Sequence, residues 1–162
     1  MVEASKKLSA PSGMQLSLLV LLRVLIGWHF LYEGLVKLAN PYWTSAAYLA
    51  ESQGIFAGIF KSIVANPLAL QIVDFLNIWG LIAIGLALIL GFLGTIASFA
   101  GAFLILLYYL ANPPFIGFTY SMPSEGSYLI VNKNLIEFAA LLVLAFYPTS
   151  KLVGVDRLIF KA

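Results

Sequence analysis

Residues 16–38 of the chain read LSLLVLLRVLIGWHFLYEGLVKL. The stretch is as long as the run of ~20 mostly apolar residues that a transmembrane helix needs. It also contains Arg23, His29, Glu33 and Lys37, which the hydrophobic region of a cleavable signal peptide would not carry. We therefore interpret it as a first transmembrane helix that stays in the mature protein.

The composition of the whole chain agrees with a membrane protein. Of its 162 residues, 62% are hydrophobic and 10% are charged, and the mean hydropathy is +0.99. A soluble domain is about half apolar and about a quarter charged. The apolar content excludes disorder, and a net charge of +2 excludes a nucleic-acid binder. With no Cys and one His, the chain has no thiol chemistry and no motif for a metal, a haem or a flavin.

Three further apolar stretches predict three more membrane crossings. The break between the second and third stretches is only about five residues long, so we expect an antiparallel helical hairpin there. The fold class is an all-α integral membrane protein, a four-transmembrane-helix bundle that forms one domain over residues 1–162. The predicted spans are residues 16–38, 68–92, 94–111 and 128–147.

Charge outside the spans predicts the orientation. Lys6 and Lys7 precede the first span, and Lys151, Arg157 and Lys161 follow the fourth. Because cytoplasmic segments carry an excess of Lys and Arg, we place both termini in the cytoplasm and the protein in the inner (plasma) membrane.

Residues 39–67 then form the first outer connection. Ile55, Ile59 and Ile63 recur there at helical spacing, which predicts one or two short interfacial helices on the membrane surface. Thr44 and Ser45 are the candidate N-cap residues.

Polar residues within the spans are the candidates for function. At 100° per residue, Arg23, His29, Glu33 and Lys37 fall within an arc of about 120° on one helix face. A charge at a membrane centre costs about 2.5–3.5 kcal/mol, so such residues face the bundle and pair there. The second span adds Asp74 and Asn77, and the fourth adds Lys133, Asn134 and Glu137.

Counting residues places Glu33, Asp74 and Glu137 in one layer near the outer face. Carboxylates held in such a layer could carry protons beside an apolar pocket. The alternative is that the layer only clamps the helices together.

The sequence resembles the DoxX family over nearly its whole length. The matching segments, in order along the chain, are residues 22–38, 40–45, 48–49, 77–81, 84–86, 108–110 with 113–114, 131–137 and 154–158. This family of small four-helix membrane proteins includes the DoxD-type subunit of thiosulfate:quinone oxidoreductase, which works with a second, small subunit. The resemblance implies an oxidoreductase associated with quinone, a thiosulfate-type electron donor and partner membrane subunits. It assigns to the site Arg23, Glu33, Lys37, Asn77, Asn134 and Glu137.

Combining the resemblance with the polar residues gives each candidate a role. The proton carriers are Glu33, Glu137 and Asp74. The substrate-binding residues are Arg23, His29, Lys37, Asn77, Lys133 and Asn134. The quinone pocket is lined by Trp28, Tyr32, Trp79 and Tyr108.

Two other functions remain open. The chain could be a structural or accessory subunit of a larger respiratory or photosynthetic membrane complex, in which the buried charges fix helix register. It could also be a small-solute transporter, although no inverted repeat or broken helix is visible in the sequence.

Overall fold

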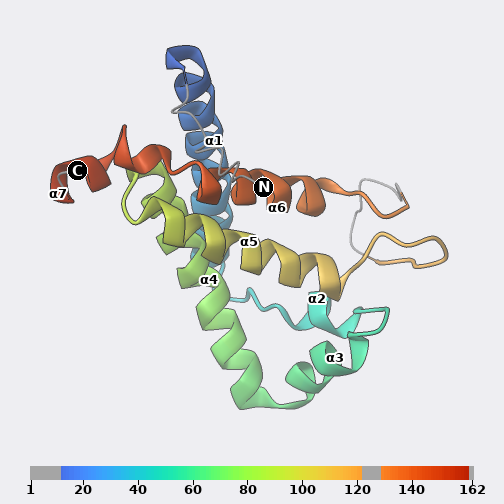
Figure 1. Cartoon of the computed structure of the whole chain (residues 1–162). Coiled ribbons are helices and arrows are strands. Elements are labelled where there is room, and N and C mark those ends of the chain that lie inside the picture. Colours follow the sequence, from blue (N-terminus) through green and yellow to red (C-terminus); the bar gives the residue numbers. More distant parts are fainter. Residues whose placement is uncertain (1–11, 122–128, 161–162) are drawn as a thin grey trace, which may run out of the picture.

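The computed structural model describes residues 12–121 and 129–160, and in this part of the chain every regular element is helical (Figure 1). The elements are α1 (Gly13–Ala39), α2 (Ala46–Ala50), α3 (Ala57–Ala65), α4 (Pro67–Leu90), α5 (Gly94–Ala111), α6 (Lys133–Phe146), the 3₁₀ helix η1 (Thr149–Lys151) and α7 (Val155–Ile159).

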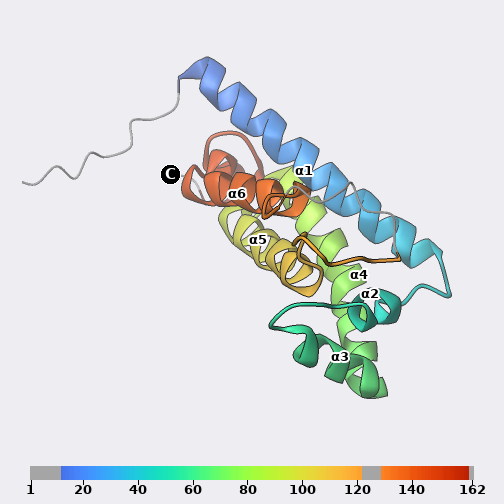
Figure 2. The same ribbon diagram turned by 90° about the vertical axis from the view of Figure 1, so that its right-hand side faces the viewer.

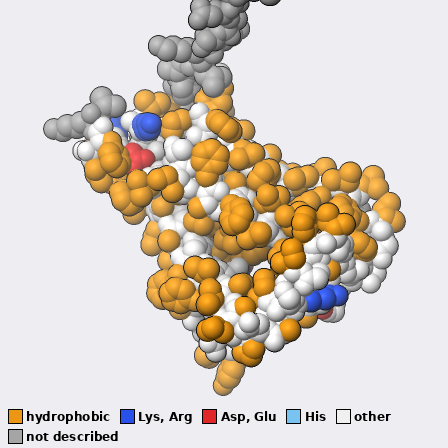
Figure 3. All heavy atoms as spheres, turned by 60° about the horizontal axis from the view of Figure 1, so that its bottom comes forward, with side chains coloured by type: hydrophobic (Ala, Val, Ile, Leu, Met, Phe, Trp, Pro, Cys, Tyr) orange, Lys and Arg blue, Asp and Glu red, His pale blue; other side chains and the backbone are white. Residues whose placement is uncertain are grey.

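Three helices in the described ranges, α1, α4 and α5, are long and apolar enough to cross a membrane. They coincide with the first three predicted spans to within a few residues. The space-filling view shows hydrophobic side chains over most of one face, with the charged groups near its edges (Figure 3). The chain is a multi-pass membrane protein in a lipid bilayer.

The fourth predicted span is shorter in the structure. Helix α6 has 14 residues and so extends about 21 Å, less than the ~30 Å hydrocarbon core. It begins at Lys133 because the side chain of Asn132 accepts a hydrogen bond from the backbone N–H of Leu135 and caps the helix. The predicted start at Tyr128 lies outside the described residues, and residues 129–132 are not helical.

Helix α4 has sequence signals at both ends. Asn66 accepts hydrogen bonds from the N–H groups of Leu68 and Ala69, and Pro67 occupies the first helical position. Gly91 ends the helix in the left-handed conformation, with φ of 66°. The chain then turns directly into α5, and the two helices diverge from this turn as an open antiparallel hairpin (Figure 1).

Helices α1 and α4 pack with their backbones in contact. A Cβ atom added at Gly85 would lie 2.7 Å from the Gly27 carbonyl oxygen and 2.8 Å from the Leu31 Cα. A Cβ atom added at Gly34 would meet the backbone nitrogen of Ile82 at 3.0 Å. Small residues at helix contacts permit this close approach in membranes. The contact fixes which face of α1 remains available to the other helices.

Helix α6 lies along α5, and this second pair closes the core (Figures 1 and 2). Leu141 of α6 is fully buried and lies over Gly101 of α5. The core continues through residues from all four long helices: Ile26, Phe30, Leu81, Leu88, Ala97, Ala102, Ile105, Leu141 and Leu144.

Two short helices occupy the first long connection, where one or two were predicted. Helices α2 and α3 lie between the diverging ends of α4 and α5 (Figure 2). Leu49 and Phe60 pack there with Ala111 of α5. Ser45, one of the two candidate N-cap residues, occupies the N-cap position of α2, although its hydroxyl donates to Asp74 and makes no capping bond.

The C-terminal segment is fastened to the α4–α5 turn. The N-cap position of α5 is occupied by Leu93, whose side chain cannot accept a hydrogen bond, and Asp156 of α7 provides the missing cap. Its carboxylate accepts hydrogen bonds from the N–H groups of Leu93, at 2.7 Å, and Gly94, at 3.1 Å. The Asp156 N–H in turn donates to the Gly91 carbonyl.

Arg23 joins the same junction from α1. Its side chain is buried, and it donates to the Thr149 hydroxyl at 3.0 Å and to the Val153 carbonyl at 2.9 Å. Burial opposes ionisation of Asp156, but the hydrogen bonds from the backbone N–H groups of Gly94 and Leu93 and the charge of Arg23 outweigh it. The pKa of Asp156 is therefore below its usual value of 3.8.

The glycine contact predicts a position-specific effect of alanine. Gly85→Ala would place a methyl group against the backbone of α1, so we expect it to cost about 1–3 kcal/mol of stability. Gly80→Ala in the same helix is the matched control, because a Cβ there meets nothing within 4 Å. Thermal unfolding in detergent, followed by circular dichroism, measures both variants. Equal melting temperatures for the two would contradict the close contact.

We expect that replacing Asp156 lowers the stability of the protein and weakens the dependence of that stability on pH. Asp156→Ala leaves two N–H groups of α5 without their acceptor, which costs about 0.5–2 kcal/mol. Because the folded-state pKa is lowered, the ionised group stabilises the protein fully above pH 3.8, and this stabilisation is lost as the pH falls through the folded-state value. Melting temperatures between neutral and acidic pH should fall more steeply for the wild type than for Asp156→Asn, which keeps one acceptor oxygen. Parallel curves would show that the carboxylate does not titrate as described.

Candidate functional site

A cavity of about 140 Å³ lies between the four long helices. Phe30, Leu81 and Ile105 form its apolar side, and they belong to the buried core. Polar side chains from α1, α5 and α6 complete it: His29, Glu33, Lys37, Tyr108, Lys133, Asn134 and Glu137.

His29 and Glu137 link α1 to α6 at the cavity. The His29 Nδ1 atom lies 2.9 Å from the Glu137 Oε1 atom, so an imidazole N–H at this position donates to the carboxylate. The Glu137 side chain is 12% exposed, whereas that of His29 is 48% exposed. The cavity is thus bordered by a histidine that reaches the outer surface of the helices.

Lys37 is held by neutral groups as well as by charge. Its ammonium donates to the Asn77 side-chain oxygen at 3.1 Å and lies 5.1 Å and 5.5 Å from the ring centroids of Trp43 and Tyr108. Cation–π attraction of this kind is strongest where water is excluded. The Glu33 carboxylate is 3.9 Å away and 47% exposed, so it is a weak partner for the ammonium.

Asn77 continues this chain of hydrogen bonds. Its amide nitrogen donates to the Tyr108 hydroxyl at 2.6 Å. The Tyr48 hydroxyl donates to the Tyr108 backbone carbonyl at 2.8 Å. Lys37, Asn77 and Tyr108 therefore connect α1, α4 and α5, and α2 is attached to the same group.

The first two turns of the short helix α6 form part of the cavity wall. Its cap at Asn132 sets the start of the helix, so Lys133, Asn134 and Glu137 lie within its first two turns. The spacing of Lys133 and Glu137 places them on one face. All three were predicted as site residues, and all three line the cavity.

Three of the predicted proton carriers and substrate-binding residues do not line the cavity: Arg23, Asp74, and Asn77, whose side-chain amide bonds Lys37 and Tyr108. Asp74 accepts hydrogen bonds from the Thr44 hydroxyl and from the backbone N–H of Ser45, so it holds the start of α2 and does not line the cavity. Arg23 lies at the C-terminal junction with Thr149. The predicted layer of three carboxylates therefore separates into Glu33 and Glu137 at the cavity and Asp74 outside it.

Three of the four predicted quinone-pocket aromatics point outward. Trp28, Tyr32 and Trp79 are exposed on the helix surface and do not line the cavity, while Tyr108 does. The apolar wall consists instead of Phe30, Leu81 and Ile105, which the sequence analysis did not select. Phe30 lies on the same α1 face as the charged residues, so its helical spacing could have identified it as a residue of the cavity wall.

The contact between Trp43 and Lys37 was also not predicted. Only the fold of residues 40–45 back toward α1 brings them together, and local spacing gives no sign of it. In the described ranges, no three His, Asp or Glu side chains are arranged to hold a metal ion.

Comparison with protein families identifies the chain. The family model described as DoxX matches residues 18–112, which is more than half of the sequence. The chain belongs to the DoxX family. The match runs from α1 to the end of α5, so the DoxX segment contributes His29, Lys37 and Tyr108, while α6 and Glu137 lie beyond it. Searches of curated proteins and of solved structures returned no match.

The hydrogen-bonded chain predicts that Asn77 stabilises this DoxX protein. Asn77→Ala removes the acceptor of Lys37 and the donor to Tyr108 together, and loss of buried partners costs about 1–3 kcal/mol. Asn112→Ala is the control, because the Asn112 side-chain oxygen is buried without a hydrogen-bond partner among the described residues. Melting temperatures in detergent should fall for Asn77→Ala and change little for Asn112→Ala. A larger fall in melting temperature for Asn112→Ala than for Asn77→Ala would show that the Lys37–Asn77–Tyr108 hydrogen bonds do not stabilise the protein.

Proposed function

We propose that this DoxX protein is the quinone-reactive subunit of a membrane oxidoreductase, with the quinone headgroup bound in the cavity between α1, α4, α5 and α6. The observation that carries the proposal is the His29–Glu137 pair beside a small apolar wall. The pair can move protons, and the wall can hold a ring.

The size of the cavity fits one ring. A cavity of about 150 Å³ accommodates a six-membered aromatic ring. The 140 Å³ here, with Phe30, Leu81 and Ile105 on one side, suits a quinone headgroup and leaves no room for an isoprenoid tail. The exposure of His29 gives the tail a direction of exit, toward the lipid.

The polar side of the cavity supports proton transfer. A bound quinone accepts two electrons and two protons to become a quinol. His29 and Glu137 share a hydrogen bond at the cavity edge. When one of them gives a proton to the quinone, the other can therefore supply a proton to replace it. Lys37, fixed by Asn77, provides a positive charge for an oxygen that gains electron density.

The electron donor is proposed from the family. With thiosulfate, two anions lose one electron each and join through a sulfur–sulfur bond as tetrathionate, which balances the reduction of one quinone. In this proposal the donor reacts close to the quinone or passes its electrons through a partner subunit.

The proposed arrangement in the membrane follows the predicted topology. Helix α6 serves as a short fourth span, so that both termini lie in the cytoplasm and the α4–α5 turn lies on the same side. Helices α2 and α3 lie at the outer surface. The exposed side chains of Ile59 in α3 and of Ile55, just before α3, support contact with lipid.

A structural role is the second candidate, and the Lys37–Asn77–Tyr108 chain favours it. These bonds cross three helices and would hold the bundle together without any chemistry. In that case, changes at the cavity would reduce stability or assembly with a partner and leave no rate to measure.

Quinone binding separates the two functions. The full chain is purified in mild detergent, and quinone is extracted with organic solvent and quantified per chain. We expect a near-stoichiometric amount in the wild type and a large loss in Ile105→Trp, which fills the cavity from its apolar side. Phe103→Trp, at an exposed position of the same helix, is the control. An equal quinone content per chain in the two variants would show that quinone does not bind in this cavity.

Turnover tests the proton carriers. Glu137→Gln should lower thiosulfate-dependent quinone reduction about 10²–10⁴-fold, because the amide cannot take part in proton transfer. Glu51→Gln, whose carboxylate accepts from the Ser121 N–H outside the cavity, should keep the wild-type rate. Melting temperatures of both variants serve as a check on folding. An unchanged rate in Glu137→Gln would remove this residue from the mechanism.

A further inference from the structure

A second cavity lies at the opposite end of α5, beside the α4–α5 turn. It has a volume of 450 Å³ and lies between the first turn of α5 and the C-terminal segment formed by η1 and α7. Thr95 and Ile96 line it from α5, and Lys151, Asp156, Arg157 and Phe160 line it from the C-terminal segment. None of the proposed redox residues belongs to it.

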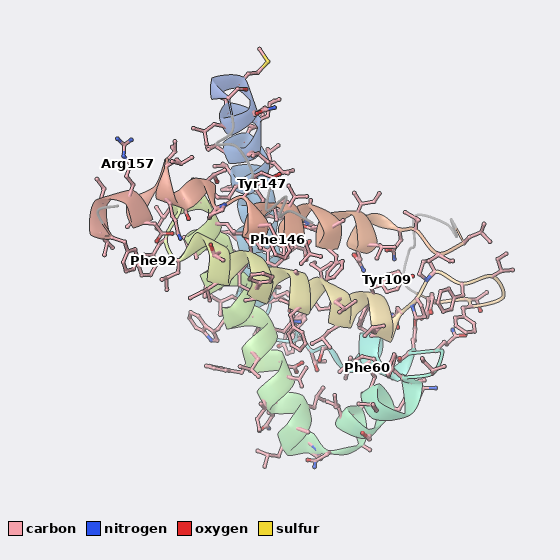
Figure 4. All side chains as sticks on the ribbon, viewed as in Figure 1. Phe60, Phe92, Tyr109, Phe146, Tyr147 and Arg157 are labelled. Carbon is pink, nitrogen blue, oxygen red and sulfur yellow. The ribbon has the colours of Figure 1, made fainter. Side chains whose placement is uncertain are left out.

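The charge around this cavity favours an anion. Lys151 and Arg157 are both exposed cations at its border. Asp156 also lines the cavity, but its carboxylate is already engaged by the N–H groups of α5 and faces Arg23, so the two exposed cations outnumber it. Arg157 donates once within its own segment, to the Leu152 carbonyl at 3.3 Å, which uses one of the five guanidinium donors. Figure 4 shows its side chain extending outward from α7.

The rest of the cavity wall is apolar and open. Ile96 is 63% exposed and Phe160 is 59% exposed, although both are large hydrophobic side chains. A ligand that matches both walls has an anionic group for the two cations and an apolar body beside Ile96 and Phe160. A free inorganic anion matches only the first.

The length of α5 fixes the depth of the cavity in the membrane. The helix has 18 residues and spans about 27 Å, close to the ~30 Å hydrocarbon core. Its first turn is therefore at the level of the lipid headgroups. Basic cavities beside transmembrane helices at this level bind anionic headgroups.

We propose that this cavity binds an anionic phospholipid, whose phosphodiester contacts Lys151 and Arg157 and whose acyl chains lie along Ile96 and Phe160. The volume is within the range of about 300–1,000 Å³ for small-molecule sites. The bound lipid joins α7 to α5, next to the Asp156 cap, and so strengthens the attachment of the C-terminal segment.

The test measures lipid binding to the full chain after delipidation in mild detergent. Native mass spectrometry counts bound dioleoyl phosphatidylglycerol and gives its affinity. The doubly substituted Lys151→Gln/Arg157→Gln protein should bind about thirtyfold more weakly, because each basic residue near anionic lipid contributes a factor of about five to six. Lys61→Gln, which removes one exposed cation from α3, is the control and should bind as the wild type does.

Three further measurements separate the possible ligands. Dioleoyl phosphatidylcholine should bind much more weakly than phosphatidylglycerol, and inorganic phosphate should not displace the lipid at comparable concentration. The variant Lys151→Arg/Arg157→Lys keeps both charges and should keep binding. Equal affinity of the wild type and the glutamine variant, equal binding of the two lipids, or displacement by phosphate would each overturn the proposal.

Discussion

Direct backbone contact between α1 and α4 is the constraint on which the rest of this structure depends. Gly27 and Gly85 have no side chain between the two helices, so the helices approach until main-chain atoms touch. This contact occupies one face of α1 and determines its rotation. The adjacent stripe then directs His29 to Glu137 of α6, and Lys37 to Asn77 of α4 and the Tyr108 ring of α5. Both side chains find partners inside the protein that lipid could not provide.

The polar residues form two separate groups with different chemistry. The group at the C-terminal junction is closed: the Asp156 carboxylate and the Arg23 guanidinium are buried and bonded mainly to backbone. The group at the first cavity is more open, since His29 and Glu33 both remain about half exposed. Stability favours the first arrangement, whereas a site that exchanges protons with a ligand needs the second.

The sequence predicted the first three membrane helices well, and also the face of α1 that carries His29, Glu33 and Lys37, because both depend on local composition and helical periodicity. It also selected Glu137, Asn134 and Lys133, although they lie more than a hundred residues from His29. It failed where a partner comes from elsewhere in the fold. Spacing alone could not show that Asp74 binds Thr44, or that Arg23 binds Thr149. A helical wheel shows which way a side chain points, but it does not show which residue of another element the side chain meets there. The start of α6 was misplaced because hydropathy does not register a polar cap such as Asn132.

The Asp156 cap has a consequence for biosynthesis. The chain leaves the ribosome from its N-terminus, and Asp156 follows Gly94 by 62 residues. Helix α5 must therefore enter the bilayer with its first N–H groups still bound to water or lipid headgroups. Insertion of the spans and fastening of the α4–α5 turn are separate events in time, and the second waits for α7. The C-terminal segment completes the hydrogen bonding of the α4–α5 turn only after α1, α4, α5 and α6 have been synthesised.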